Sequence, residues 1–123
     1  MMTNPYDTYK QQSVKTMTSG QMLVLVYNEL IKQLGLAQQA FDKNDIPEIN
    51  RSLQKSQLII HELKGTLNFD YSISNNLNDL YDYFYSVILN ANIKKDSSEL
   101  QRIIEMASEL KETFTEAERL ARG

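Results

Sequence analysis

The chain has 123 residues, which is enough for one domain with a single core and too few for two. Its net charge is −3 and its sequence pI about 5.1, with lysines and arginines dispersed, so we expect no nucleic-acid-binding surface. It has no cysteine, which excludes disulfides and thiolate chemistry, and its four glycines and two prolines leave long uninterrupted segments that are typical of helices.

Targeting signals are not found in the sequence. Residues 1–7 are polar and lack the basic and then apolar pattern of a signal peptide. The longest apolar run, residues 22–27, is far shorter than the roughly 20 residues that span a bilayer. We therefore expect a soluble, cytoplasmic protein without membrane insertion.

Residues 1–17 have a turn signal at Asn4-Pro5 and no sustained hydrophobic period, and we expect them to form an N-terminal arm. The arm carries Tyr6 and Tyr9, which a merely solvated terminus has little use for. Two explanations stay open: the tyrosines pack on the side of the rest of the protein, or they bind a partner.

The first helix is predicted to begin near Thr18, which can cap its first turn, and to end near Asn44. Its apolar side chains recur at alternating spacings of four and three, as in antiparallel bundles: Leu23, Tyr27, Leu30, Leu34, Ala37 and Phe41. A second set widens this stripe: Met22, Val24, Leu25, Val26 and Ile31. The first half of this helix is therefore either the central helix or one wall of a groove.

The second helix follows a capping signal at Asp45 and Glu48, with Pro47 in its first turn. Its stripe is Ile46, Ile49, Leu53, Ser56, Ile60, Leu63 and Leu67. Ser56 interrupts the apolar series, which predicts close approach by a bulky side chain of another helix. We expect a loop over residues 68–75.

The third helix, residues 76–93, is entered through Ile73 and carries more apolar and aromatic surface than one helix face can bury. Its predicted core stripe is Leu77, Leu80, Phe84, Val87 and Ala91. Tyr81, Tyr85 and Ile88 extend the apolar sector on one side and Tyr83 on the other. Either these tyrosines lie half-buried at helix seams, or they line a groove for a partner's amphipathic helix.

The fourth helix is predicted from a capping signal at Asp96 and Glu99. Its stripe is Leu100, Ile103, Ala107, Leu110, Phe114, Ala117 and Ala121. Four helices with short connections favour antiparallel neighbours. The sequence thus predicts an all-α fold, an antiparallel up-down four-helix bundle over residues 18–123, with an aromatic N-terminal arm.

The residue inventory argues against catalysis. His61 is the only histidine, so the paired Glu-x-x-His motifs of di-metal bundles are excluded, and no phosphate loop or nucleophile elbow occurs. We expect no enzyme, no metal and no cofactor. A His-containing phosphotransfer module, or another helical adaptor bundle, is the alternative, because one histidine on a four-helix bundle is the minimum that such a module needs.

Several short motifs follow one another along residues 4–113. They are Asn4-Pro5-Tyr6-x-x-Tyr9-Lys10, Ser13-Val14-x-Thr16, Leu25-Val26-Tyr27, Gln57-x-Ile59-Ile60-x-Glu62-Leu63, Thr66-Leu67-Asn68, Asn76-Leu77-x-x-Leu80-Tyr81-Asp82-Tyr83 and Ala91-Asn92. Each motif alone is weak, but their colinear occurrence resembles the flagellin-specific export chaperones of bacteria, the FliS family.

This resemblance implies a cytosolic chaperone that binds the C-terminal helical segment of flagellin in apolar surface grooves. It implies that the chaperone prevents premature polymerisation of flagellin and escorts it to the flagellar type III export apparatus. The arm is implied to cover part of the groove surface in the free protein. The export gate and other flagellar regulators are further implied partners, and self-association stays open.

Matching positions supply the predicted partner-binding residues. By resemblance, the arm contributes Tyr6 and Tyr9, and the family's characteristic helix positions are Tyr27, Tyr81, Asp82, Tyr83 and Asn92. The apolar sectors add Leu23, Val26, Tyr85 and Ile88. Two positions depart from the family pattern: Asn28 stands where an acid is usual, and Phe114 where tryptophan is frequent.

Overall fold

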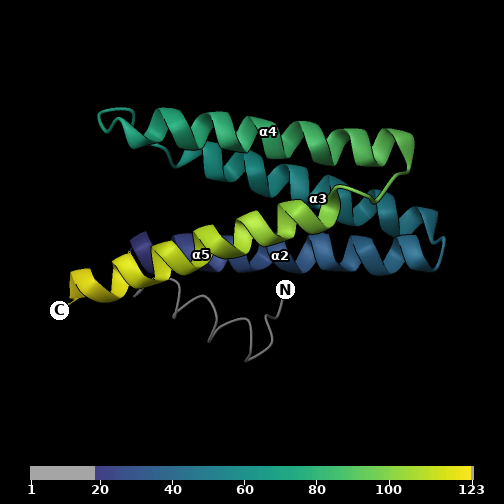
Figure 1. The fold of residues 1–123 in the computed structure, drawn as a ribbon, viewed down its shortest axis with the longest axis horizontal. Helices are drawn as coiled ribbons and strands as arrows, with labels where there is room; N and C mark the ends of the chain where they lie inside the picture. Colours follow the sequence, from purple (N-terminus) through teal and green to yellow (C-terminus); the bar gives the residue numbers. More distant parts are fainter. Residues whose placement is uncertain (1–18, 123) are drawn as a thin grey trace, which may run out of the picture.

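The computed structural model describes residues 19–122, which form four helices (Figure 1). They are α2 (Ser19–Asp42), α3 (Ile46–Gly65), α4 (Ile73–Lys94) and α5 (Leu100–Arg122). Each helix runs antiparallel to the one before it, so the predicted all-α four-helix bundle is confirmed. The predicted arm, with Tyr6 and Tyr9, lies outside the described residues.

The four helices do not pack equally. Helix α2 packs extensively against both α3 and α5, and α4 packs mainly against α3. Helices α4 and α5 have the smallest contact of these pairs, and Figure 1 shows α5 diverging from α4 toward its C-terminal end. The α2–α3 pair therefore forms the centre of the bundle, with α4 and α5 on its two flanks.

The turn between α2 and α3 is short because both helix ends are capped by local residues. Asn44 adopts a left-handed conformation with φ of 53°. Its N–H donates to the carbonyl of Phe41 at 3.1 Å, and the N–H of Asp45 donates to the carbonyl of Ala40 at 2.9 Å, which is the Schellman pattern. The Asp45 side chain then accepts from the N–H of Glu48 at 3.3 Å, so the predicted cap of α3 is confirmed.

The end of α4 uses a second left-handed residue, Lys95, with φ of 51°. The N–H groups of Lys95 and Asp96 both donate to the carbonyl of Ala91. The Asp96 side chain accepts from the N–H of Ser98 at 2.9 Å, which lowers the pKa of that carboxyl group. This bond reaches two residues along the chain, whereas a capping box to Glu99 would have reached three.

The connection between α3 and α4 is shorter than the predicted loop over residues 68–75, because α4 already begins at Ile73. The side chains of Asn68 and Ser74 form hydrogen bonds with backbone groups of this connection. The N–H of Asp70 donates to the Asn68 side chain at 2.9 Å, and the Ser74 hydroxyl donates to the Asn68 carbonyl at 2.6 Å. These local hydrogen bonds, rather than helix propensity, determine where α4 begins.

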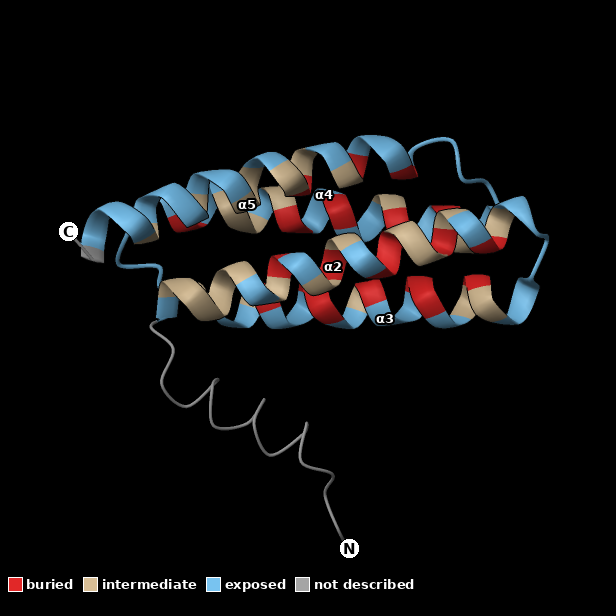
Figure 2. Cartoon of the chain, turned by 90° about the horizontal axis from the view of Figure 1, so that it is seen from below, coloured by how far each residue is buried: buried red, intermediate tan, exposed pale blue. Residues whose placement is uncertain are grey.

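One core runs along the axis of the bundle and receives side chains from all four helices (Figure 2). Its largest fully buried members are Tyr27, Leu30, Leu34, Ile49, Leu53, Ile60, Leu63, Tyr81, Phe84, Ile88, Leu100 and Ile103. Ser52 and Ser56 of α3 are also buried, and their hydroxyls donate to the carbonyls of Glu48 and Ser52, each at 2.8 Å. Their buried polar groups are thus satisfied within the helix.

The buried face of α4 differs from the predicted stripe. Tyr81 and Ile88 are fully buried together with Phe84, whereas Leu77, Leu80 and Val87 are only partly buried. The reason is that α4 packs mainly on α3 and little on α5, which turns its buried face away from the position expected in an evenly packed bundle.

The apolar stripe of α5 leaves the core before the helix ends. Leu100, Ile103 and Ala107 are buried, while Phe114 is half-buried. Ala117 and Ala121 are exposed, so the last turns of α5 do not contribute to the core as the stripe had predicted.

Candidate functional site

Tyr27 of α2 and Tyr81 of α4 meet inside the bundle. Their hydroxyl oxygens are 2.5 Å apart, and one hydroxyl donates to the other. The ring of Tyr27 also stacks on the ring of Phe114, with centroids 5.6 Å apart and planes inclined by 26°. The three aromatic side chains connect α2 with both flanking helices.

Burial raises the pKa of the Tyr27 hydroxyl far above its ordinary value, and the bond to Tyr81 raises it further. Burial also raises the pKa of Tyr81, which its bond to Tyr27 partly offsets. Both side chains therefore stay protonated and neutral, as a buried hydroxyl pair requires. They serve packing rather than acid–base chemistry.

Three predicted partner-binding residues are consequently not on the surface. Tyr27 and Ile88 are 0% exposed and Tyr81 is 1% exposed. A partner could reach these three side chains only if the core opened, and their part in partner binding stays a prediction. Helix α4 does carry more aromatic surface than its buried face holds, as the hydrophobic period predicts. The hydrogen bond between the two hydroxyls lets Tyr81 lie in the core, so a different side of the helix faces outward.

The outer side of α4 carries Tyr83 and Tyr85, which are 36% and 40% exposed. The Tyr83 ring lies against Phe84, with centroids 6.3 Å apart. Because they are two residues apart on a helix, the two tyrosines lie on different flanks. Leu89 adds further exposed apolar surface to this helix.

The two predicted polar positions on α4 bond within the fold. Asp82 forms an ion pair with Lys64 and so joins α4 to α3. The Asn92 side chain accepts from the Lys95 ammonium at 2.6 Å, and the same ammonium donates to the Asn50 side chain at 2.7 Å. Both residues hold α4 in place as well as lying near the surface.

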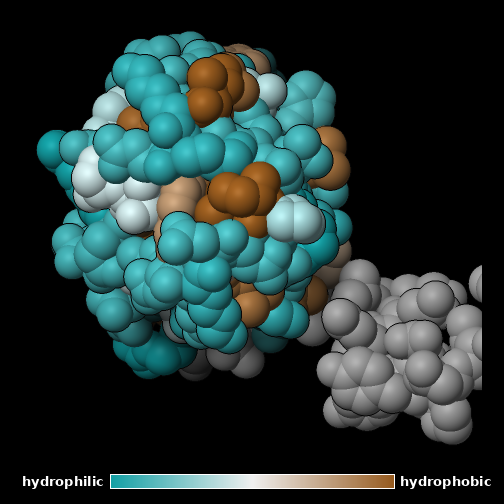
Figure 3. All heavy atoms as spheres, turned by 90° about the vertical axis from the view of Figure 1, so that its right-hand side faces the viewer, coloured by the Kyte–Doolittle hydropathy of each residue, from teal (hydrophilic) through white to brown (hydrophobic). Residues whose placement is uncertain are grey.

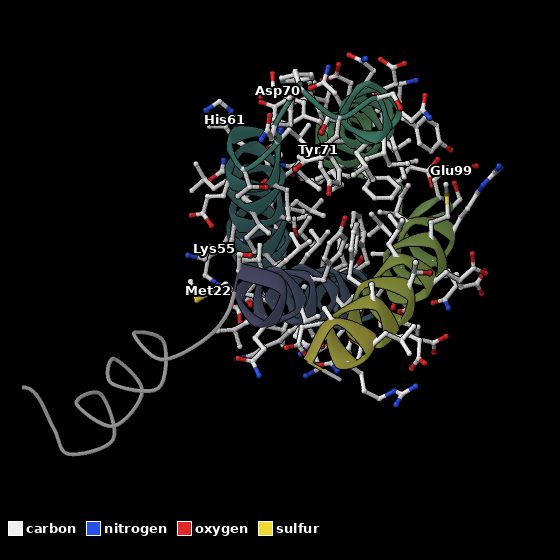
Figure 4. All side chains as sticks on the ribbon, turned by 90° about the vertical axis from the view of Figure 1, so that its left-hand side faces the viewer. Met22, Lys55, His61, Asp70, Tyr71 and Glu99 are labelled. Carbon is white, nitrogen blue, oxygen red and sulfur yellow. The ribbon has the colours of Figure 1, made fainter. Side chains whose placement is uncertain are left out.

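A hollow of about 460 Å³ lies where α2 begins, beside the C-terminal end of α3. We call it the apolar hollow, and it is lined by Ser19, Gly20, Met22, Leu23, Val26 and Thr66. It brings together Leu23 and Val26, which are among the partner-binding residues predicted from the apolar sectors. Met22 projects from the outer side of the α2–α3 pair (Figure 4).

A second hollow lies further along the same two helices. We call it the charged hollow, and it is lined by Leu25, Val26, Glu29, Lys32, Lys55, Ile59 and Glu62. Apart from Val26, these residues were not predicted as a site. The signal was present only as charges one turn apart on α2, Glu29 and Lys32, and two turns apart on α3, Lys55 and Glu62. Their proximity depends on how α2 and α3 pack.

The opposite end of the bundle, with the α2–α3 turn and the α4–α5 connection, shows small separate apolar patches in a hydrophilic surface (Figure 3). Ile46, the first residue of α3, and Ile93, in the last turn of α4, are exposed beside these two connections. A shallow hollow at the α4–α5 connection is lined by Val87, Asn90, Ala91, Lys94, Asp96, Ser98 and Glu99. Its lining mixes charged and polar groups and offers little apolar area to a partner.

His61 projects outward from α3 into solvent (Figure 4). Within residues 19–122, no group of three or more histidine, cysteine or acidic side chains is placed to hold a metal ion. None of the four described helices combines the length and apolar character that a membrane span needs.

Comparisons with known proteins bear on the identity of this bundle. A family model described as flagellar protein FliS matches residues 2–121. A relative from Bacillus subtilis (strain 168), named flagellar secretion chaperone FliS, is 36% identical over 114 residues, covering 93% of this chain and 86% of the relative. The chain belongs to the FliS family.

In this FliS-family chain, the two positions that the resemblance singled out, Asn28 and Phe114, lie in different settings. Asn28 is exposed on α2, so its missing charge affects the surface alone. Phe114 is half-buried and stacks on Tyr27, so a ring of smaller volume than tryptophan still closes the α2–α5 contact.

Proposed function

We propose that this chain is a flagellar secretion chaperone for flagellin. It binds the C-terminal helical segment of flagellin in apolar surface grooves, prevents its premature polymerisation and escorts it to the flagellar type III export apparatus. The single observation that carries the proposal is membership of the FliS family across residues 2–121, together with the name of the Bacillus subtilis relative.

The shape and chemistry of the bundle support helix-in-groove recognition. The apolar hollow at Met22, Leu23 and Val26 lies at the start of α2, beside the C-terminal end of α3. Tyr83 and Tyr85 offer amphipathic side chains on the outer side of α4. Aromatic and aliphatic side chains of this kind are typical anchors for an amphipathic helix.

Binding of this kind requires neither a cofactor nor catalysis. A flagellin segment that cannot bury its apolar face alone would order on the chaperone, and the buried area would offset the lost conformational entropy. While it is bound, the same apolar face is unavailable to other flagellin molecules, which is how the chaperone delays polymerisation. We place this activity in the cytosol, with the export gate as the next partner.

The direct test mixes the protein with the C-terminal segment of flagellin from the same organism and measures the mass of the complex by size-exclusion chromatography with light scattering. We expect a stable complex with a defined stoichiometry. Met22→Glu, which places a charge in the apolar hollow, should weaken the complex. Ile46→Glu is the matched control, because it adds the same charge at an exposed site in the α2–α3 turn region.

A second test follows the polymerisation of full-length flagellin by light scattering. Stoichiometric chaperone should lengthen the lag before filaments appear. The Met22→Glu variant should lengthen this lag less than the parent does. If the parent protein neither binds the segment nor delays polymerisation, the proposed function is wrong.

The phosphotransfer alternative has no structural observation in its favour. His61 makes no hydrogen bond or ion pair with another side chain of residues 19–122, so nothing there orients its ring for phosphate transfer. We expect His61→Ala to keep full binding of the flagellin segment.

A further inference from the structure

The apolar and charged hollows follow one another along the α2–α3 pair. They share Val26. The lining positions Lys55, Ile59 and Glu62 of α3 and its C-cap residue Thr66 recur at spacings of four, three and four, so they lie along one helical stripe. We call the combined surface the α2–α3 furrow. From Met22 to Lys32 it extends about 15 Å at the rise of an α-helix, which is about three helical turns.

The chemistry of the furrow changes along its length. The end near Met22 and Leu23 is apolar, the middle carries Glu29 and Glu62, and the far end carries Lys32 and Lys55. On α2 the acid precedes the lysine along the chain, and on α3 the lysine precedes the acid. Because the two helices are antiparallel, the two acids therefore lie toward one end of the charged hollow and the two lysines toward the other. The result is an apolar–acidic–basic order that neither helix has alone.

Most of these charged side chains form no hydrogen bond or ion pair with another described residue. Glu29 accepts from the Gln33 amide at 2.9 Å. Lys32, Lys55 and Glu62 form no ion pair or hydrogen bond within residues 19–122. Acids elsewhere on α3 and α5 do pair, as Glu48 does with Arg51. The furrow charges are therefore available to a partner.

The walls of the furrow favour a helical partner over an extended one. Both walls are α-helices, whose backbone N–H and C=O groups are already paired internally. An extended segment would leave its own backbone groups without partners in the apolar hollow, at a considerable cost in free energy. A helix satisfies its own backbone and presents side chains alone.

We propose that the α2–α3 furrow holds one amphipathic helix of the cargo in a single register, with apolar side chains in the apolar hollow and a carboxylate held between Lys32 and Lys55. This inference rests on the proposed function. Since Lys32 lies six residues beyond Val26, the cargo carboxylate lies about 9 Å, or roughly six residues, from the apolar side chain that contacts Val26. Glu29 and Glu62 repel a carboxylate placed one turn too early, so the charge order selects the register.

The test measures the affinity of the flagellin C-terminal segment at several salt concentrations. The double variant Lys32→Glu/Lys55→Glu is compared with Lys43→Glu/Lys111→Glu, which changes the net charge equally but lies outside the furrow. We expect salt to weaken binding by the parent, and we expect the furrow variant to bind about tenfold or more weakly and to lack this salt dependence. The control should keep the parent's affinity within about twofold and its salt dependence. Thermal unfolding of both variants verifies that they fold.

A cross-linking measurement tests the register directly. The chain has no cysteine, so Met22→Cys introduces a unique site for a photoreactive label. Cross-links to the flagellin segment should fall within one helical turn in the parent background and spread over several turns in Lys32→Glu/Lys55→Glu.

The outcomes separate the two proposals. If the parent binds and the two double variants behave alike, or if parent cross-links are already spread, the furrow inference is overturned while the chaperone function stands. If the parent does not bind the segment, the proposed function fails and this inference fails with it.

Discussion

The buried hydroxyls of Tyr27 and Tyr81 depend on each other, because each side chain is almost completely removed from solvent and their oxygens are 2.5 Å apart. Removing one hydroxyl leaves the other without its partner, whereas removing both leaves two phenyl rings of similar shape. Single and double substitutions at these positions should therefore behave very differently.

We predict that Tyr27→Phe and Tyr81→Phe each lower the free energy of unfolding by about 1–3 kcal/mol. The double variant should lose clearly less than the sum of the two single losses, because it contains no orphaned hydroxyl. Denaturant unfolding of the four proteins measures this coupling. Strictly additive losses would show that the hydroxyl bond contributes nothing specific.

The same pair predicts a loss of stability in alkali. Burial raises the pKa of both hydroxyls above the value of about 10 that tyrosine has in an unfolded chain. Above pH 10 the unfolded state releases these protons and the folded state retains them, so the free energy of unfolding falls as pH rises. Below pH 10 the pair's contribution is fully present.

Tyr27→Phe/Tyr81→Phe should accordingly show a shallower decline of stability above pH 10 than the parent. Unfolding measured between pH 8 and pH 11.5 provides the comparison. Equal slopes in the two proteins would contradict the assignment of this pH dependence to the buried pair.

Exposed and buried aromatic residues of α4 should separate stability from binding. Tyr83→Ala and Tyr85→Ala should each change the free energy of unfolding by less than about 1 kcal/mol, while Phe84→Ala in the core should cost about 3–5 kcal/mol. At least one tyrosine variant should weaken binding of the flagellin segment by about 2 kcal/mol. Calorimetric unfolding and titration measure both quantities. If both variants bind like the parent, these tyrosines are not part of the binding surface.

At the scale of helices, the elements could be predicted from sequence because caps and hydrophobic periods are local. Asp45 caps α3 as expected, and the apolar period of α2 places Leu30 and Leu34 in the core. The rotation of α4 could not be predicted, since it depends on the packing of α4 on α3 and on the hydroxyl bond between Tyr81 and Tyr27, which are 54 residues apart. The hydrophobic period therefore predicts that α4 is a helix but does not predict which face of it is buried.

The C-terminal end of α4 offers a test at this scale. Lys95 has φ of 51°, where a Cβ atom is disfavoured. Both Lys95→Gly and Lys95→Ala remove the ammonium that bonds Asn92 and Asn50, so their difference reports the backbone alone. We predict that Lys95→Gly is more stable than Lys95→Ala by about 1 kcal/mol.

Ser86, an exposed residue inside α4, is the matched control position. There the order should reverse, with Ser86→Gly less stable than Ser86→Ala by about 1 kcal/mol. Thermal unfolding of the four variants measures both differences. If the Gly variant were the more stable one, or the less stable one, at both positions, the left-handed backbone conformation of residue 95 would not explain the stability difference there.

At the scale of the whole molecule, α2 is the helix with two extensive neighbours, and α5 leaves the core before it ends. The candidate site depends on this arrangement, because the furrow combines charges of α2 and α3 that are far apart in sequence. Leu23 and Val26 could be predicted from the excess apolar width of α2. Lys32 and Lys55 could not, because their proximity exists only after the two helices pack.

Hydrogen exchange should reflect the unequal packing. We predict that amides around Leu30 and Leu34 exchange most slowly, because these residues are fully buried between neighbouring helices. Amides after Phe114 should exchange fastest within α5, since Ala117, Leu120 and Ala121 are exposed. Uniform protection along α5 would contradict this ranking.

The short turn between α2 and α3 also affects the order in which the protein is made. Only residues 43–45 separate the two helices, so closing this helical hairpin costs little chain entropy and its contacts are of low contact order. Both walls of the proposed furrow precede α4 and α5 in the chain, so they are synthesised before these two helices. Nascent chains can therefore form the helical hairpin that carries the proposed furrow first and complete the flanking helices afterwards.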